Sequence, residues 1–355
     1  MLEKVTDEAA RVLRAMKEIG PRDQLVPGHV ELDYWSLTFP IQCRGPGGDQ
    51  FYFVKIPTSG APTNMRDGVP DDDSRSQGRA EFETLRVLWS FAQGHGLTAV
   101  RPLAYLDQTN AILTDFVSAI ELHDICRSAA LGSQRNRAHA SDSLTATGAW
   151  LRKFHDSHEA GSRDVELDIR TELLGRFERL NERAARPHLV RAIWDQLRAL
   201  SLDPGAVRTV ASLPEFEVRN VMVGTDGIYP VDTGAPLPRP PEADIARFVV
   251  SIAMIFWGSP LFLLRRRVDV GLIRAFLDGY GRPDFGSKAL DRWLLGLEWL
   301  RQWQDAYFVL DRVKSYPAAY RQLVAWLYID GPFSAIGMEL VSPRAGLASY
   351  RSEGK

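Results

Sequence analysis

The chain has 355 residues, of which 45% are hydrophobic, and a formal net charge of −2 at pH 7. This length and composition allow a sizeable core in one large domain or two lobes, and the near-neutral net charge gives no sign of a nucleic-acid-binding surface. Cys43 and Cys126 lie far apart without the spacing of a metal site. We therefore expect reduced thiols in a cytoplasmic protein, with a disulfide as the alternative.

Residues 1–20 predict an amphipathic helix rather than a signal peptide, because their apolar residues recur at helical spacing. Residues 29–38 and 39–44 are then expected to form two strands. Residues 51–56, Phe-Tyr-Phe-Val-Lys-Ile, form the strongest strand pattern in the chain. Three successive strands predict an antiparallel meander. Lys55 lies inside the third, where a lysine is most often the solvent-facing residue of an edge strand.

Residues 58–78 are rich in Ser, Gly, Pro and Asp and predict a mobile loop. Its acidic triplet, residues 71–73, does not predict a metal site, because neighbouring carboxylates on a flexible loop point in different directions. Residues 79–92 follow as a helix with one apolar face. A hairpin with strands at residues 100–106 and 111–117 comes next.

Helices are expected to dominate the rest of the chain. Residues 144–155 form an amphipathic pattern that ends in a histidine, and residues 165–202 are helical with many Arg and Glu. A later helix has the broad apolar face that is typical of a protein core. It carries Trp293, Trp299 and Trp303.

Residues 248–264 carry no charge, and the stretch is only just long enough for a transmembrane helix. Gly258-Ser259-Pro260 breaks the stretch, so we expect a buried core helix and no transmembrane segment. The alternative is a peripheral contact with a membrane surface. The three arginines at residues 265–267 would suit contact with a membrane or with an anionic ligand such as a membrane-linked glycan, although they also suit the solvated end of a core helix.

Residues 213–236 contain a short strand, a turn and a second strand. Asp-Gly within residues 224–227 favours a tight hairpin turn. Such a hairpin would bring Asn220 and Asp232 to the same end. An amide oxygen and a carboxylate are the hard donors that Mg²⁺ prefers. Glu215 lies on the loop that leads into this hairpin, and the alternative is an ordinary hairpin with polar ends.

This segment resembles the catalytic segment of the aminoglycoside phosphotransferase family, a small-molecule branch of the protein-kinase-like fold. The family segment reads His-Gly-Asp-Phe-x-Pro-x-Asn, followed by two short strands and Asp-aromatic-Gly. Phe216, Asn220, Asp232 and Gly234 are in register, whereas Glu215 replaces the catalytic Asp. Other departures from the family pattern are Leu213, Pro214, Val218 and Thr233.

The order of the other elements, over about residues 28–290, is similar to that of the same family. The resemblance implies an α+β, two-lobed protein-kinase-like fold. Its small antiparallel-sheet N-lobe would occupy residues 1–116 and bind nucleotide. Its larger, mostly helical C-lobe would occupy residues 117–355 and hold the catalytic segment and the acceptor site.

The resemblance also implies roles for residues of the N-lobe. Lys55 would orient the phosphates of ATP and would be held by a helix glutamate. Glu81 fits the family spacing better than Glu83. The backbone between Asp115 and Val117 would receive the adenine ring.

In the catalytic segment, Asn220 and Asp232 would bind Mg²⁺. Glu215 would accept the acceptor's hydroxyl proton or orient the acceptor. His155 is expected to be a structural contact beneath the catalytic loop rather than a base, and Asp244 to anchor the backbone of that loop.

Two classes of function follow. The first is an ATP- and Mg²⁺-dependent phosphotransferase acting on a hydroxyl of a small molecule or glycan. The second is a pseudokinase that acts as a binding module. Glu215 favours the second class, and so does the lack of glycine between Glu31 and Arg44, where the fold usually has a Gly-rich flap. Lys55, Asn220 and Asp232 favour the first.

Overall fold

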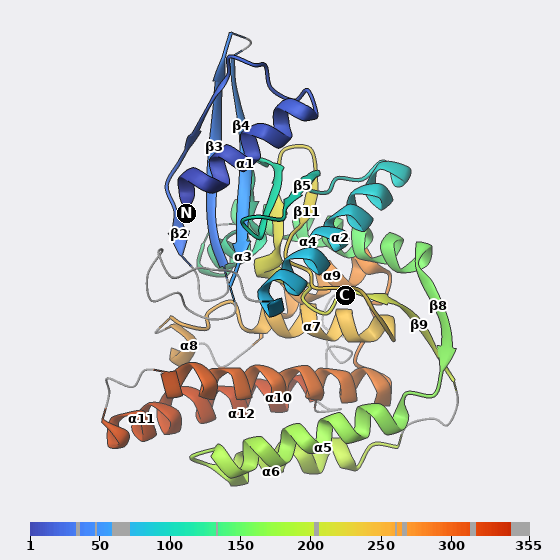
Figure 1. Cartoon of the computed structure of the whole chain (residues 1–355). Helices are drawn as coiled ribbons and strands as arrows, with labels where there is room; N and C mark the ends of the chain where they lie inside the picture. Colours follow the sequence, from blue (N-terminus) through green and yellow to red (C-terminus); the bar gives the residue numbers. More distant parts are fainter. Residues whose placement is uncertain are drawn as a thin grey trace. The chain divides into compact units, whose positions relative to one another are not determined.

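The computed structural model describes residues 1–32, 36–46, 48–58, 72–132, 134–201, 206–259, 261–264, 268–312 and 317–341. The chain forms two compact units (Figure 1). The first combines Met1–Ile120 with Met222–Ala235, and the second combines Glu121–Val221 with Pro236–Lys355. Residues 116 and 117, where the sequence predicts the lobe boundary, both belong to the first unit.

The first unit is built on an antiparallel sheet. Alternating residues of its long strands, among them Phe39, Ile41 and Val54, are buried in one core with Val5 and Leu13 of the first helix. That helix is α1 (Leu2–Ala15), as predicted. The strands pair in the order β1 (Gln24–Pro27), β3 (Ser36–Gly45), β4 (Gly48–Pro57), β6 (Ala111–Asp115) and β5 (Pro102–Leu106), and β2 (Glu31–Leu32) pairs with β3.

The division into strands at residues 29–38 and 39–44 is wrong, because Ser36–Gly45 is one strand. Pro40 does not break it. In the register Ile41 pairs with Pro27 and Thr38 with Glu31, so Pro40 lies opposite the gap between β1 and β2. A proline is tolerated in a sheet where no ladder hydrogen bond is required of it. The Pro40 carbonyl still accepts from the Gly28 N–H at 2.8 Å.

The helix expected at residues 79–92 begins earlier, inside the predicted loop. It is α2 (Asp72–His95). Asp72 and Asp73 lie in its first turn, where carboxylates are favoured by the helix dipole. The part of the predicted loop at residues 59–71 lies outside the described residues. The hairpin expected after α2 is present as β5 and β6.

The second unit is mostly helical. Its helices include α3 (Leu122–Leu131), α4 (Gln134–Ser157), α5 (Glu166–Arg183), α6 (Pro187–Arg198), α7 (Pro241–Ala253), α8 (Leu261–Leu264), α9 (Val270–Tyr280), α10 (Ala289–Arg312), α11 (Ala318–Val324) and α12 (Gly331–Val341). A small sheet has the order β12 (Leu237–Arg239), β9 (Val207–Ser212), β8 (Glu159–Arg163). α10 packs against α5 and α7 (Figure 1).

α7 is the buried helix that the uncharged stretch predicts. Every residue of it except Glu242 is buried. The chain turns at Gly258, whose φ is +84°, before α8 begins at Leu261. In the described part of the chain, no helix combines the length and apolarity needed to cross a membrane. The arginines at residues 265–267 lie outside the described residues.

The other sequence expectations for the core are also confirmed. The tryptophans of α10 are buried, and the two cysteines are free, buried thiols. Buried cysteines far apart in the sequence act as small apolar side chains.

α4 and α9 cross at glycines, which brings their backbones together. A Cβ on Gly148 would lie 2.2 Å from the carbonyl oxygen of Phe276. Likewise, a Cβ on Gly279 would lie 2.1 Å from the Thr145 carbonyl oxygen. This crossing sets the positions of the ends of both helices, including His155 and Tyr280.

We therefore expect Gly148→Ala to lower the free energy of unfolding by about 1–3 kcal/mol, because the helices must move apart. Gly175→Ala in α5 is the matched control. There the added Cβ would meet only the end of the Arg179 side chain, at 3.3 Å. Alanine is also the better helix former. Urea unfolding of both variants checks the difference, and equal stabilities would contradict the close crossing.

Candidate active site

Lys55 does not lie on an edge strand. β4 is paired on both sides, with β3 and with β6. The neighbours Val54 and Ile56 point into the core, so the Lys55 side chain points to the opposite face of the sheet. There its ammonium lies 2.8 Å from a carboxylate oxygen of Glu81 and 2.8 Å from one of Asp232. The structure thus brings three predicted site residues together within the first unit.

The charges in this cluster depend on one another. Burial alone would lower the pKa of Lys55, but the carboxylates of Glu81 and Asp232 outweigh it and raise that pKa. Burial raises the pKa of Glu81, and the nearby ammonium only partly offsets the rise. Lys55 is therefore a charged lysine held between two carboxylates. Glu83 is not part of the cluster and pairs with Arg86 on the surface of α2.

Asp232 follows a hairpin of β10 (Val221–Val223) and β11 (Ile228–Pro230). The predicted turn is present, with the Gly224 N–H donating to the Gly227 carbonyl at 2.9 Å. Asp232 has a φ of +50°, a left-handed conformation that few residues other than glycine adopt. Such conformations concentrate at functional sites. The side chain of Asp232 is 56% exposed even though it pairs with Lys55.

The predicted adenine-binding backbone lies at the end of β6. The Asp115 N–H donates to the Arg101 carbonyl at 3.0 Å, and the Phe116 N–H donates to the Phe51 carbonyl at 3.3 Å. Burial raises the pKa of the Asp115 carboxyl, although Arg101 lies 3.6 Å away. Val117 packs against the cluster that contains Leu85. This segment is therefore held in place by both the sheet and the core.

In the second unit, one polar face of α7 holds the loop that carries Glu215. Asp244 accepts from the Leu213 N–H at 2.7 Å and from the Ser212 hydroxyl. Two turns later, the Ser251 hydroxyl accepts from the Val218 N–H at 3.1 Å. The loop backbone is therefore fixed on both sides of Glu215. The anchoring role expected for Asp244 is confirmed.

His155 is fully buried at the end of α4. Its Nε2 lies 2.9 Å from Asp244, and its Nδ1 lies 2.8 Å from the Tyr280 hydroxyl. Both ring nitrogens are occupied by structural partners, so the histidine supports the anchor of the loop. The expectation of a structural contact is confirmed.

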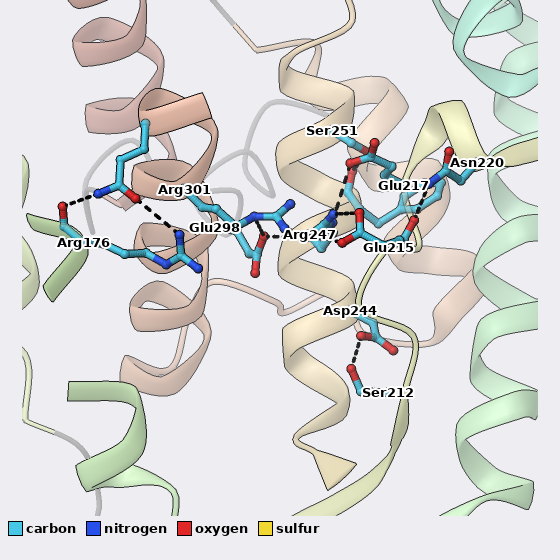
Figure 2. A network of polar contacts seen from close by, with 12 residues as sticks. Arg176, Ser212, Glu215, Glu217, Asn220, Asp244, Arg247, Ser251, Glu298 and Arg301 are labelled. Atoms are coloured by element: carbon cyan, nitrogen blue, oxygen red, sulfur yellow. Dashed lines mark hydrogen bonds and ion pairs between the residues drawn. The ribbon is translucent and has the colours of Figure 1, made fainter. Parts of the chain in front are cut away.

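Glu215 and Asn220 lie on the same loop, which is drawn in Figure 2. The Asn220 side-chain nitrogen donates to the Glu215 backbone carbonyl at 2.8 Å. The Glu215 carboxylate is paired with Arg247 of α7, and Arg301 of α10 lies 3.9 Å from it. The carboxylate at the predicted catalytic position is thus held by two arginines.

The donors at both predicted metal ligands suit Mg²⁺. The hydrogen bond of Asn220 uses its nitrogen, so its ligand atom for a cation would be the amide oxygen. Asp232 presents a largely exposed carboxylate. Mg²⁺ selects oxygen ligands of these two kinds.

No protein-family model and no curated protein sequence matches the chain. Among solved structures, it is similar to a candidate aminoglycoside phosphotransferase from Ralstonia eutropha JMP134, with a TM-score of 0.58 over 94% of this chain and 97% of that chain, at 15% identity. It is also similar to a choline/ethanolamine kinase family protein from Mesorhizobium loti, with a TM-score of 0.51 over 98% and 99% of the two chains, at 16% identity. The chain has their kinase-like fold. The predicted α+β class, with an antiparallel sheet followed by a mostly helical region, is confirmed.

Within this kinase-like fold, the residues that support the loop around Glu215, apart from Asp244, were not predicted from the sequence. Arg247 lies three residues after Asp244, and Ser251 lies four residues after Arg247, so all three share one face of α7. Polar residues at helical spacing within an apolar helix were the available signal. Arg301 and Glu298 come from α10, far along the chain, and no local pattern links them to the loop.

Proposed function

We propose that the chain is an ATP- and Mg²⁺-dependent phosphotransferase that acts on a hydroxyl of a small molecule or glycan. The observation that carries the proposal is the ion-paired cluster in which the largely buried Lys55 lies between Glu81 and the more exposed Asp232. Phosphoryl transfer depends mainly on positioning and charge neutralisation, and a charged lysine oriented by a helix glutamate is suited to both. The fold that it shares with the two solved structures supports the same reaction class.

In this proposal, the site residues bind the nucleotide, the metal ion and the acceptor. Lys55 would donate hydrogen bonds to the nucleotide phosphates while Glu81 keeps its ammonium in place, and the backbone of Asp115 and Val117 would bind adenine. Asn220 and Asp232 would hold Mg²⁺, which when bound neutralises phosphate charge. Glu215 would accept a hydrogen bond from the acceptor hydroxyl.

In the transfer step, the acceptor oxygen forms a bond to the γ-phosphorus as the bond from that phosphorus to ADP breaks. The hydroxyl proton passes to the Glu215 carboxylate. That carboxylate lies against Arg247, so it stands on the loop as the proposed acceptor of the proton.

The second candidate is a pseudokinase that binds nucleotide without transferring phosphate. One observation favours it, namely the engagement of the Glu215 carboxylate by Arg247 and Arg301. An ion-paired carboxylate is a weaker base than a solvated one. Turnover measurements on variants of Glu215 separate the two candidates.

The nucleotide site can be tested with Lys55→Ala. We expect the affinity for Mg²⁺-ATP, measured by calorimetry, to fall at least about tenfold, a loss of roughly 1.4 kcal/mol of binding free energy. The variant also leaves the buried carboxylate of Glu81 without its counter-ion, so some loss of thermal stability should accompany the change. Lys153→Ala is the control, because Lys153 is exposed on α4 and its loss changes the charge equally. Unchanged affinity in Lys55→Ala would contradict the assignment.

A further inference from the structure

Arg247 is a buried arginine that lies among three carboxylates in the second unit. Its side chain is only 6% exposed. It is paired with Glu215, and it lies 3.6 Å from Glu217 and 3.5 Å from Glu298. A buried guanidinium needs such partners, because its desolvation is costly. Figure 2 shows Arg247 extending from α7 toward the loop that carries Glu215.

Arg301 reaches the same carboxylate from a second helix. Its Nη1 lies 3.9 Å from Glu215, and its Nε lies 3.1 Å from Glu298. Burial opposes its charge, but Glu298 and Glu215 outweigh that effect and raise the pKa of Arg301. Glu298 contacts both guanidinium groups, so it offsets the repulsion that two neighbouring arginines would otherwise suffer.

The loop backbone is fixed independently of these charges. Asp244 holds it at Leu213, and Ser251 holds it at Val218. Since Arg247 lies between those two residues on the same face of α7, its guanidinium reaches the carboxylate that projects from the middle of the loop. What remains to be ordered is the Glu215 side chain itself.

A glutamate needs this help more than an aspartate does. Its extra methylene adds one rotatable bond and about 1.5 Å of reach. A misplacement near 1 Å can cost about a hundredfold in rate. The planar fork of arginine orients a carboxylate better than a lysine ammonium does.

We propose that Arg247 and Arg301 are positioning residues that clamp Glu215, so that its carboxylate faces the acceptor hydroxyl in one orientation. The inference rests on the proposed phosphotransfer. It explains how the loop accommodates glutamate at this position, and it makes Glu215, Arg247 and Arg301 one unit. Glu298, which contacts both guanidinium groups, keeps them in place.

The first test asks whether the clamp exists, and it needs no turnover. Arg247→Lys, Glu215→Gln and the double variant are unfolded in urea. If the clamp exists, the unfolding midpoint of the double variant should fall by less than the sum of the decreases in the two single variants. Each single variant already breaks the same Arg247–Glu215 pair. Additive losses would overturn the inference. The control is Arg198→Lys, which changes an exposed ion pair on α6. Its decrease in urea midpoint should simply add to that of Glu215→Gln.

The second test asks whether the clamp positions the base. Mg²⁺-ATP turnover, with water and with a panel of hydroxyl compounds as acceptors, is measured for Arg247→Lys and Arg301→Lys in the natural chain and in Glu215→Asp. In the natural chain we expect kcat to fall about tenfold to a hundredfold with little change in KM for ATP. In Glu215→Asp each lysine substitution should change kcat less than about twofold, because the shorter carboxylate does not reach the clamp.

The outcomes separate the two proposals. Equal losses of kcat in both backgrounds would mean that the arginines only stabilise the unit, and the positioning inference would be wrong. Non-additive unfolding without turnover in the natural chain would contradict the proposed phosphotransfer, while the pair itself would stand. Additive unfolding together with turnover would leave phosphotransfer supported and the clamp refuted.

Discussion

Replacing Glu215 with glutamine is expected to reduce phosphoryl transfer by about 10²–10⁴-fold while the affinity for Mg²⁺-ATP stays unchanged. Glutamine keeps the size of the side chain but cannot accept a proton from the acceptor, and positioned acid–base groups contribute rate factors of this size. It also loses the charge that pairs with Arg247. Affinity is expected to persist because the proposed phosphate contacts come from Lys55 of the first unit. Initial rates of ADP release and nucleotide calorimetry measure the two quantities.

Glu217→Gln is the matched control for this prediction. It makes the same chemical change two residues away, and its carboxylate lies 3.6 Å from the same arginine. A similar loss of turnover in both variants would show that the charge network matters rather than the Glu215 carboxylate.

Glu215→Asp decides between the two candidate functions. In an active enzyme it should not raise turnover, because the shorter side chain falls short of the acceptor. If it creates transfer where the natural chain has none, the natural protein is a nucleotide-binding module.

Replacing Asp244 with alanine is expected to cost about 3–5 kcal/mol of unfolding free energy, the range for breaking a buried charged hydrogen-bond network. The carboxylate is almost completely buried and accepts from Ser212, the Leu213 N–H and His155. Alanine would leave all three donors buried without an acceptor. Turnover should also collapse, since the loop loses its anchor next to Glu215. Urea unfolding followed by circular dichroism gives the free energy.

The control for this variant is Asp195→Ala on α6. Asp195 is half-exposed and pairs with Arg198 at the surface, where such pairs contribute at most about 1 kcal/mol. Asp244→Asn keeps the volume of the side chain and one acceptor oxygen. Its free energy of unfolding should therefore lie between those of Asp244→Ala and the natural chain. A loss below about 1 kcal/mol in Asp244→Ala would mean that the loop does not depend on this anchor.

The parts of the fold that could be predicted are those with a local cause. Residues 51–56 combine β-branched and aromatic side chains, and they lie in β4. The strand of Lys55 and the helix of Glu81 could be predicted from their own patterns, but the pairing of these two residues was implied only by the family resemblance. The turn before β11 was predictable from Asp-Gly. Residues 213–236 could be predicted to be a catalytic segment only through their resemblance to a family.

The parts that could not be predicted depend on distant residues. Pro40 suggests a strand break, and only the gap between β1 and β2 explains why β3 continues through it. The start of α2 at Asp72 was not predicted, because the residues around it have the composition of a loop. The pairing of Arg301 with Glu215 joins residues whose contact exists only after α10 packs on α7. Tertiary packing, rather than local preference, determines these features.

The contribution of residues 222–235 to the first unit has a consequence for biosynthesis. Tyr229 shares a buried cluster with Leu85, Val100 and Ile112, and Thr98 donates to the Ile228 carbonyl at 2.7 Å. During translation, the part of the first unit that Tyr229 and Ile228 cover stays exposed to solvent until residues 121–221 have been synthesised and residues 222–235 follow. The nascent chain therefore exposes an apolar surface during translation, and a protein cut after residue 120 would expose it permanently. Exposed surfaces of this kind are where nascent chains aggregate or bind chaperones.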